Sequence, residues 1–133
     1  MTRFSGLSSL DEAVFSGEAN FVLARFNDAA YFSQARFKDK ALFGLVKFED
    51  IASFQNITFD SELNLKSAQI STMLLEKANF KKNSKIVLND ADFKRLKAHW
   101  NDIKDNVVYE AGVYLALINN YRGVGWHNDE DDC

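Results

Sequence analysis

Phenylalanines recur along this chain with a spacing that leaves few possible folds. All twelve fall on one ladder, and from Phe15 to Phe59 the steps alternate between six and five residues without a slip. Leucine or isoleucine occupies the rungs that phenylalanine leaves, as at Leu65 and Ile70. A small or aliphatic residue, most often alanine, stands two positions before most rungs. A separation of two is strand spacing, which puts both side chains on one face of the strand.

This short period predicts a solenoid. A recurrence every five or six residues is too short for a helical hairpin or a propeller blade, and it fits a chain that turns a corner after each short strand. Five plus six, taken twice, gives a coil of 22 residues with four corners, and this step stacks Phe15, Phe37 and Phe59 in one column. We therefore expect an all-β solenoid whose narrow interior holds one large and one small side chain at each strand.

The repeated pair of alanine and phenylalanine from Phe4 to Phe93 resembles the pentapeptide-repeat family. The resemblance implies a right-handed quadrilateral β-helix of about four coils, which we assign to residues 1–94. The chain departs from the commonest family pattern in favouring Phe over Leu at the centre and in adding an eleventh residue to each pair of repeats. These departures affect the regularity of the corners and leave the predicted solenoid unchanged.

The period changes after Phe93. Four apolar residues are spaced as one face of a helix: Leu96, Trp100, Ile103 and Val107. Four more are spaced as a second helix face: Tyr114, Leu117, Ile118 and Tyr121. Asn106 is a plausible break between the two helices, and Gly123 and Gly125 provide a stop. Because solenoids need their ends covered, we expect residues 95–133 to form a two-helix α-helical cap with an acidic tail.

This tail is similar to a helical segment that follows the repeats in some prokaryotic pentapeptide-repeat proteins. The matching residues are Trp100, Tyr114, Leu115, Leu117, Ile118, Tyr121, Arg122 and Gly125. In those relatives the chain usually continues, often towards membrane-spanning helices, so we expect a fragment of a longer protein that is tethered to a membrane through its missing C-terminal region. The present residues contain no run long enough to insert directly into a bilayer.

Charge and cysteine content narrow the possible cellular location and the possible classes of partner. Cys133 is the single cysteine, so an internal disulfide framework is excluded and a cytoplasmic location is expected. Residues 1–96 carry thirteen basic and twelve acidic residues, whereas the remainder carries three basic and seven acidic ones. Some family members mimic DNA and inhibit DNA topoisomerase-type enzymes, which requires a strongly acidic rod. The near-neutral charge of the repeats disfavours this alternative. The sequence also lacks the basic groove that direct nucleic-acid binding requires, so we predict no such binding.

The sequence offers little chemistry. It contains no Gly-rich phosphate loop, no nucleophile elbow and no His-Glu-x-x-His motif, so we predict no enzyme activity and no cofactor. His99 is interpreted as a surface or cap histidine. Four residues of the tail could be imagined as metal ligands, but we interpret them as solvated and predict no metal site. These residues are His127, Asp129, Asp131 and Cys133.

Surface recognition is the remaining class of function. Four outward positions on neighbouring coils are apolar, namely Val22, Leu23, Leu42 and Leu45. Such a cluster marks a contact surface or is incidental, and we leave both readings open. The long step from Phe80 to Leu88 also exposes three lysines, which either meet an acidic partner or keep a loop solvated: Lys81, Lys82 and Lys85. The sequence thus predicts an interaction or structural scaffold that contacts a protein partner or itself.

Overall fold

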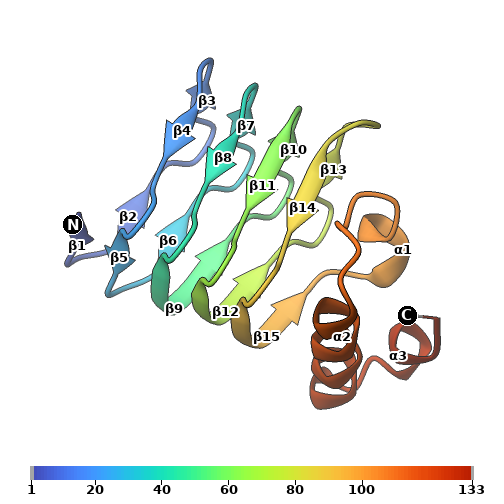
Figure 1. The fold of residues 1–133 in the computed structure, drawn as a ribbon. Coiled ribbons are helices and arrows are strands. Elements are labelled where there is room, and N and C mark those ends of the chain that lie inside the picture. Colours follow the sequence, from blue (N-terminus) through green and yellow to red (C-terminus); the bar gives the residue numbers. More distant parts are fainter. Residues whose placement is uncertain (1, 133) are drawn as a thin grey trace.

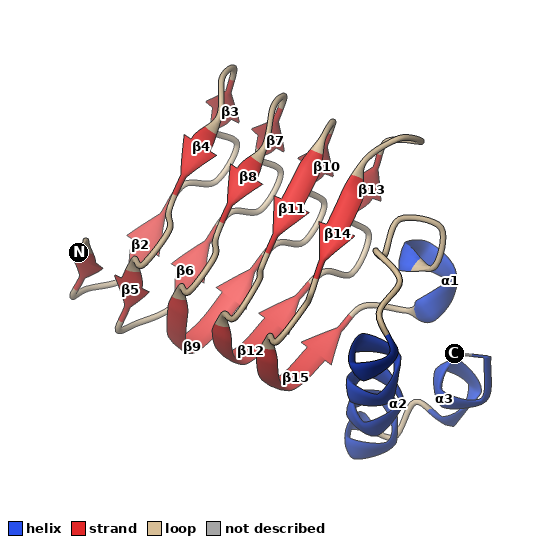
Figure 2. Ribbon diagram, in the orientation of Figure 1, coloured by secondary structure: helices blue, strands red, loops and turns tan. Residues whose placement is uncertain are grey.

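The computed structural model describes residues 2–132, which form a four-sided parallel β-solenoid of about four coils with helices at one end (Figure 1). The coils lie side by side from the N-terminal end to the C-terminal end, where the helices gather (Figure 2). This architecture confirms the predicted all-β solenoid with a C-terminal helical segment.

The strands fall into four columns, one for each side of the solenoid. The first side contains β1 (Arg3–Phe4), β5 (Arg25–Phe26), β9 (Lys47–Ser53), β12 (Gln69–Leu74) and β15 (Asp92–Lys97). The second contains β2 (Ser8–Ser9) and β6 (Ala30–Tyr31), and is continued by the later parts of β9, β12 and β15. The third contains β3 (Val14–Phe15), β7 (Arg36–Phe37), β10 (Thr58–Phe59) and β13 (Asn79–Phe80). The fourth contains β4 (Ala19–Asn20), β8 (Ala41–Leu42), β11 (Glu62–Asn64) and β14 (Lys85–Val87).

The register between coils keeps each rung of the ladder in its column. Phe37 pairs with Phe15 on one side and Phe59 on the other, and the ring centroids are 4.6 Å and 5.4 Å apart. Rings from opposite columns meet edge to face across the interior, as Phe32 and Phe43 do at 5.8 Å and 88°. Both geometries are favourable for aromatic pairs, so the predicted phenylalanine columns are confirmed as the core.

The position two residues before each rung has space only for a small side chain, as predicted. Ala30, Ala41 and Ala52 have no exposed surface. Each stands two residues before a rung whose ring is fully buried in the core, and protein interiors are close-packed. A larger side chain at these positions would therefore have to displace a phenylalanine ring.

The alternation of five and six residues has a structural cause at the corners. Each five-residue step closes with a tight turn, as where the N–H of Ala24 donates to the carbonyl of Phe21 at 3.0 Å. The residue two positions after the rung then has a positive φ, as in a type II turn. Within residues 2–132, eight residues occupy this left-handed position: Glu12, Leu23, Gln34, Leu45, Asn56, Ser67, Lys77 and Asp90.

The C-terminal segment differs in part from the prediction. α1 (Trp100–Ile103) is a single turn, α2 (Ala111–Val124) is the expected long helix, and α3 (His127–Asp132) is an additional short helix. The predicted first helix is wrong at both ends. Leu96 belongs to β15, where it pairs with Met73, and Val107 forms a parallel bridge with Ile86. Their helical spacing is a coincidence of two strand positions that flank a short turn.

Candidate contact surface

The four apolar residues that the sequence singled out lie on and beside the fourth side of the solenoid. Leu42 is half-buried on β8, while Val22, Leu23 and Leu45 sit at the corners that follow β4 and β8 and are 40%, 49% and 55% exposed. Val22, Leu42 and Leu45 line one shallow depression of about 380 Å³. Leu23 lies on the same corner column as Leu45, since its N–H donates to the carbonyl of Gly44 at 3.0 Å. The structure thus brings the predicted residues together.

Two of these leucines occupy left-handed corner positions. Leu23 has a φ of 65° and Leu45 a φ of 56°. A left-handed conformation costs an L-residue other than Gly or Asn roughly 1–2 kcal/mol, and exposure of a leucine adds no compensating burial. The other six left-handed corners carry polar residues. Leu23 and Leu45 are therefore the two apolar exceptions, and they lie on neighbouring coils in one patch. Their backbone conformation is unfavourable for stability.

Gly44 was not identified from the sequence, yet it shapes the floor of this depression. It lies between Leu42 and Leu45, and a methyl group added there would come 3.9 Å from Cγ2 of Val22 and 3.6 Å from the carbonyl of Lys66. These are ordinary contact distances, so glycine is not sterically required. Its effect is to leave the space beside Val22 open.

The lysine corner is present as predicted but is not an isolated basic patch. Lys81 and Lys82 are exposed on the loop between β13 and β14, and Lys85 is the exposed first residue of β14. Lys85 is in register with Glu62 on β11, and Lys82 and Lys85 share a depression with Asp105. Nearby acidic side chains therefore partly neutralise the positive charge of this corner.

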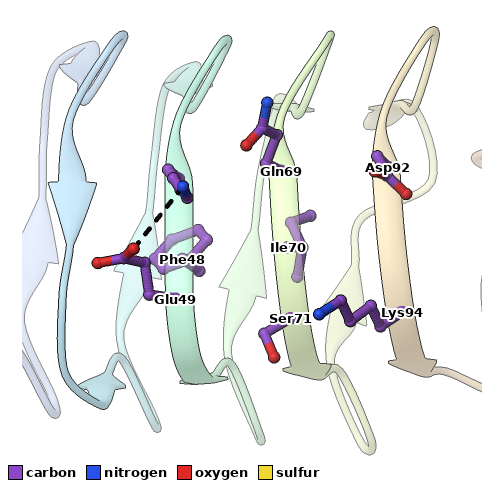
Figure 3. Close-up of a pocket in the computed structure, with 8 residues that line it drawn as sticks. Phe48, Glu49, Gln69, Ile70, Ser71, Asp92 and Lys94 are labelled. Carbon is purple, nitrogen blue, oxygen red and sulfur yellow. Dashed lines mark ion pairs between the residues drawn. The ribbon is translucent and has the colours of Figure 1, made fainter.

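The first side of the solenoid carries charges of both signs. A depression of about 350 Å³ lies between residues of β9, β12 and β15, and its rim includes Lys47, Glu49 and Lys94 (Figure 3). Arg25 donates two hydrogen bonds to Glu49, at 3.2 Å and 2.7 Å, which lower the pKa of that carboxyl and raise the pKa of Arg25. Such exposed pairs neutralise each other, so this side is a mixed lattice without a dominant sign.

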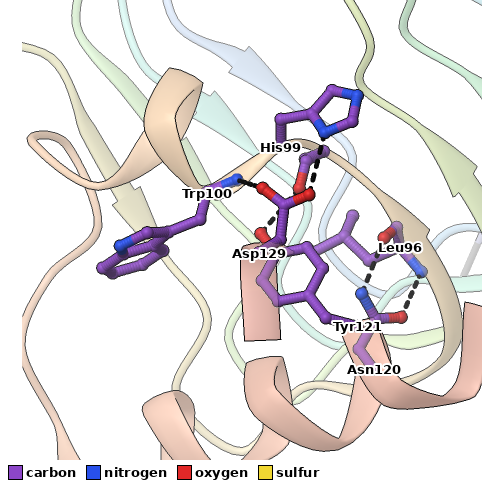
Figure 4. A network of polar contacts seen from close by, with 7 residues as sticks. Leu96, His99, Trp100, Asn120, Tyr121 and Asp129 are labelled. Carbon is purple, nitrogen blue, oxygen red and sulfur yellow. Dashed lines mark hydrogen bonds and ion pairs between the residues drawn. The ribbon is translucent and has the colours of Figure 1, made fainter. Parts of the chain in front are cut away.

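The C-terminal helices are fixed to the last coil by polar contacts (Figure 4). The side-chain amide of Asn120 accepts from the N–H of Leu96 and donates to its carbonyl, both at 2.7 Å. The hydroxyl of Tyr121 donates to the carbonyl of Ala98 at 2.6 Å. Asp129 lies 3.0 Å from Nδ1 of His99, which is exposed within the cap. The first two side chains thus give hydrogen-bond partners to both backbone groups of Leu96 in β15 and to the carbonyl of Ala98 after it.

Among the side chains that the structure describes, no three metal-ligating residues group together. Asp129 is used in the cap contact with His99, whereas the side chains of His127 and Asp131, and all of Cys133, lie outside what the structure describes. Over the same described residues, no helix has the length and apolar character needed to cross a bilayer.

Comparison with known proteins gives one match. The family model described as "Pentapeptide repeats (9 copies)" matches residues 2–46 and 24–69, which together cover just over half of the chain. No curated protein matches the chain, and no solved structure does either.

Proposed function

This chain belongs to the pentapeptide-repeat family, and on that premise we propose that it is a protein-interaction scaffold whose contact surface is the apolar patch of Val22, Leu23, Leu42 and Leu45. Pentapeptide-repeat solenoids are typically non-catalytic repeat scaffolds. The proposed partner is another protein or a second copy of the chain. We place this function in the cytoplasm, either free or tethered through a longer parent protein.

The observation that carries the proposal is the residue type at the left-handed corners. Six of the eight such corners are polar, and the two leucines are stacked neighbours whose side chains are about half exposed. Stability alone would favour Gly or Asn at these positions. An exposed leucine that is retained against stability on a shared surface is expected where that surface makes a contact.

Rigidity supports the same function. The corners of the patch are fixed by hydrogen bonds between coils, as where the N–H of Leu45 donates to the carbonyl of Lys66 at 2.9 Å. A surface that is already ordered loses little conformational entropy on binding, so a small apolar patch contributes more net affinity than it would on a mobile loop.

Photo-cross-linking tests the proposal directly. A benzophenone-bearing residue placed at Leu23 should yield a specific adduct in cells, whereas the same residue at Gln34, a left-handed corner on another column, should not. Introducing Leu42→Glu with Leu45→Lys should abolish the adduct, because each charge would have to be desolvated without a counterpart. The pair leaves the net charge unchanged, and an unchanged melting temperature would show that the fold is intact. Equal adducts at both positions would contradict the proposal.

The alternative, a DNA-mimic inhibitor of a topoisomerase-type enzyme, requires a continuous acidic surface. In the described repeats, Arg25 pairs with Glu49 and Arg36 pairs with Asp60 at 2.8 Å, so acidic and basic groups alternate. A supercoiling assay separates the two functions. Dose-dependent inhibition that survives the Leu42→Glu and Leu45→Lys pair would favour the alternative over the apolar patch.

A further inference from the structure

The two ends of the solenoid differ in whether the outer edge of the terminal coil is covered. At the C-terminal end, residues 106–108 extend the fourth side beyond β14, since the N–H of Ile86 donates to Asn106 and the N–H of Val108 donates to Ile86. Asn120 makes hydrogen bonds with both backbone groups of Leu96 in β15. The last coil is therefore covered by groups from the same chain (Figure 1).

At the N-terminal end, the structure of residues 2–132 places nothing over the first coil. The strands β1, β2, β3 and β4 each pair with the second coil only. Four core rungs of the first coil remain partly exposed, whereas the equivalent rungs of the second coil are fully buried. The first set is Phe4, Leu10, Phe15 and Phe21, and the second is Phe26, Phe32, Phe37 and Phe43.

The backbone of this end is also open. The N–H groups of Ser8 and Leu10 donate to the second coil, so the backbone groups of Ser9, which point the opposite way, face outward. The same alternation holds on β4. The N–H groups of Ala19 and Phe21 donate to the second coil, so the backbone groups of Asn20 point away from it. Such a strand edge is a template for pairing with another strand.

We propose that this end binds the same end of a second copy, forming a two-fold symmetric dimer through the first coil. A partner for this surface must present strands on four sides of a square around an apolar centre, and another N-terminal end has that shape. The helices cover the opposite end, so head-to-tail stacking into a filament is blocked and the contact closes as a dimer. This surface borders the apolar patch of the proposed function at the corner of Val22 and Leu23, but it does not include Leu42 or Leu45 of the second coil.

Charge selects the orientation of the two copies. Arg3 is the basic residue of the first coil, on β1, and the acidic residues flank the opposite strand β3, with Asp11 and Glu12 at one corner and Glu18 at the next. A two-fold axis through the middle of β2 and β4 places β1 of one copy on β3 of the other, so Arg3 lies between acidic corners of the second copy. An axis through β1 and β3 would instead stack acidic corner on acidic corner, which is unfavourable.

In this orientation the strands of the two copies run antiparallel. β2 then pairs with β2 of the second copy, and β4 with β4, so the outward backbone groups of Ser9 and Asn20 gain partners. The phenylalanine columns continue across the contact and the four partly exposed rungs become buried.

Sedimentation equilibrium of the whole chain tests the dimer. Any purification tag should follow the C-terminus, because residues added before Met1 would occupy the proposed contact. Between about 1 μM and about 1 mM, the mass should rise from 15.1 kDa to twice that value. Amide exchange of Ser9 and Asn20 should slow over the same range, because dimer formation gives their N–H groups acceptors.

Charge reversal tests the orientation. Arg3→Glu should weaken the dimer roughly tenfold or more, and adding Glu12→Lys with Glu18→Lys should largely restore it, because a charge at each facing corner is then inverted. Asp11 is kept because it accepts a hydrogen bond from the N–H of Ser33. Lys104→Glu, at the covered end, is the matched control for net charge and should have no effect. A monomer at all concentrations overturns the proposal. So does a dimer that is insensitive to Arg3→Glu, or one that is abolished by Leu42→Glu with Leu45→Lys.

Discussion

Single rungs of the ladder differ sharply from the corners between them. Phe37 is fully buried and stacks on the rings of Phe15 and Phe59, so its loss would leave a cavity that touches three coils. We expect Phe37→Ala to lower the free energy of unfolding by about 3–5 kcal/mol. Asp39→Ala, at an exposed corner, should stay within about 0.5 kcal/mol. Equal shifts of melting temperature in the two variants would show that the inward and outward positions are misassigned.

The left-handed leucines give a second prediction at the residue scale, with the opposite sign. Leu45→Asn should raise the free energy of unfolding by about 1 kcal/mol, since Asn tolerates a positive φ and the leucine side chain is mostly exposed. The same variant should weaken contact through the patch. Leu42→Asn is the control, because Leu42 is not in the left-handed conformation and should gain no stability. Denaturant unfolding measures both, and a loss of stability in Leu45→Asn would remove the case that this leucine is retained for binding.

At the scale of elements, one side chain of α2 makes both hydrogen bonds to Leu96 of β15. Asn120 is 6% exposed and satisfies both backbone groups of Leu96. Asn120→Leu preserves the volume and leaves a buried N–H and a buried carbonyl without partners, so we expect a loss of about 2–4 kcal/mol. Asn119→Leu, on the exposed face of the same helix, is the matched control and should be nearly neutral. Similar melting temperatures for the two variants would mean that the helix is held by its apolar contacts alone.

The C-terminal cap was less predictable from the sequence than the solenoid. The solenoid follows from the sequence because each coil repeats the same local pattern, so an error in one rung is corrected by its neighbours. The cap is not repeated: Leu96 and Val107 have helical spacing but complete two different sides of the sheet. Asn120 lies between Leu117 and Tyr121 on the buried face of α2, and a polar residue on such a face was the available signal for a buried hydrogen bond.

The candidate patch was predictable to a similar extent. Its outward positions follow from the coil length, because Val22 and Gly44, and likewise Leu23 and Leu45, differ by one coil. The left-handed backbone was not foreseen, since leucine is not a residue type that indicates positive φ. It arises because every five-residue step uses the same turn, whatever residue occupies its third position.

For the whole molecule, stability should be graded along the solenoid axis, because each coil contacts only its neighbours and one end is covered. In dilute solution, where a dimer would dissociate, the first coil should open most often. The N–H of Phe21 should therefore exchange at least about tenfold faster than those of Phe43 and Leu65, which occupy the same column in the next two coils, although all three make hydrogen bonds of 2.7–2.8 Å.

The control for this gradient comes from the covered end. Asn120→Leu should accelerate exchange of the N–H of Leu75, which donates to the carbonyl of Lys97 at 3.0 Å in the last coil, and should leave the rate at Phe21 unchanged. That pattern would show that each end opens independently and that the cap, not the chemistry of the coils, creates the asymmetry. If Phe21, Phe43 and Leu65 instead exchange at one common rate, the solenoid unfolds as a single cooperative unit and the open end has no separate fluctuation that a second copy could suppress.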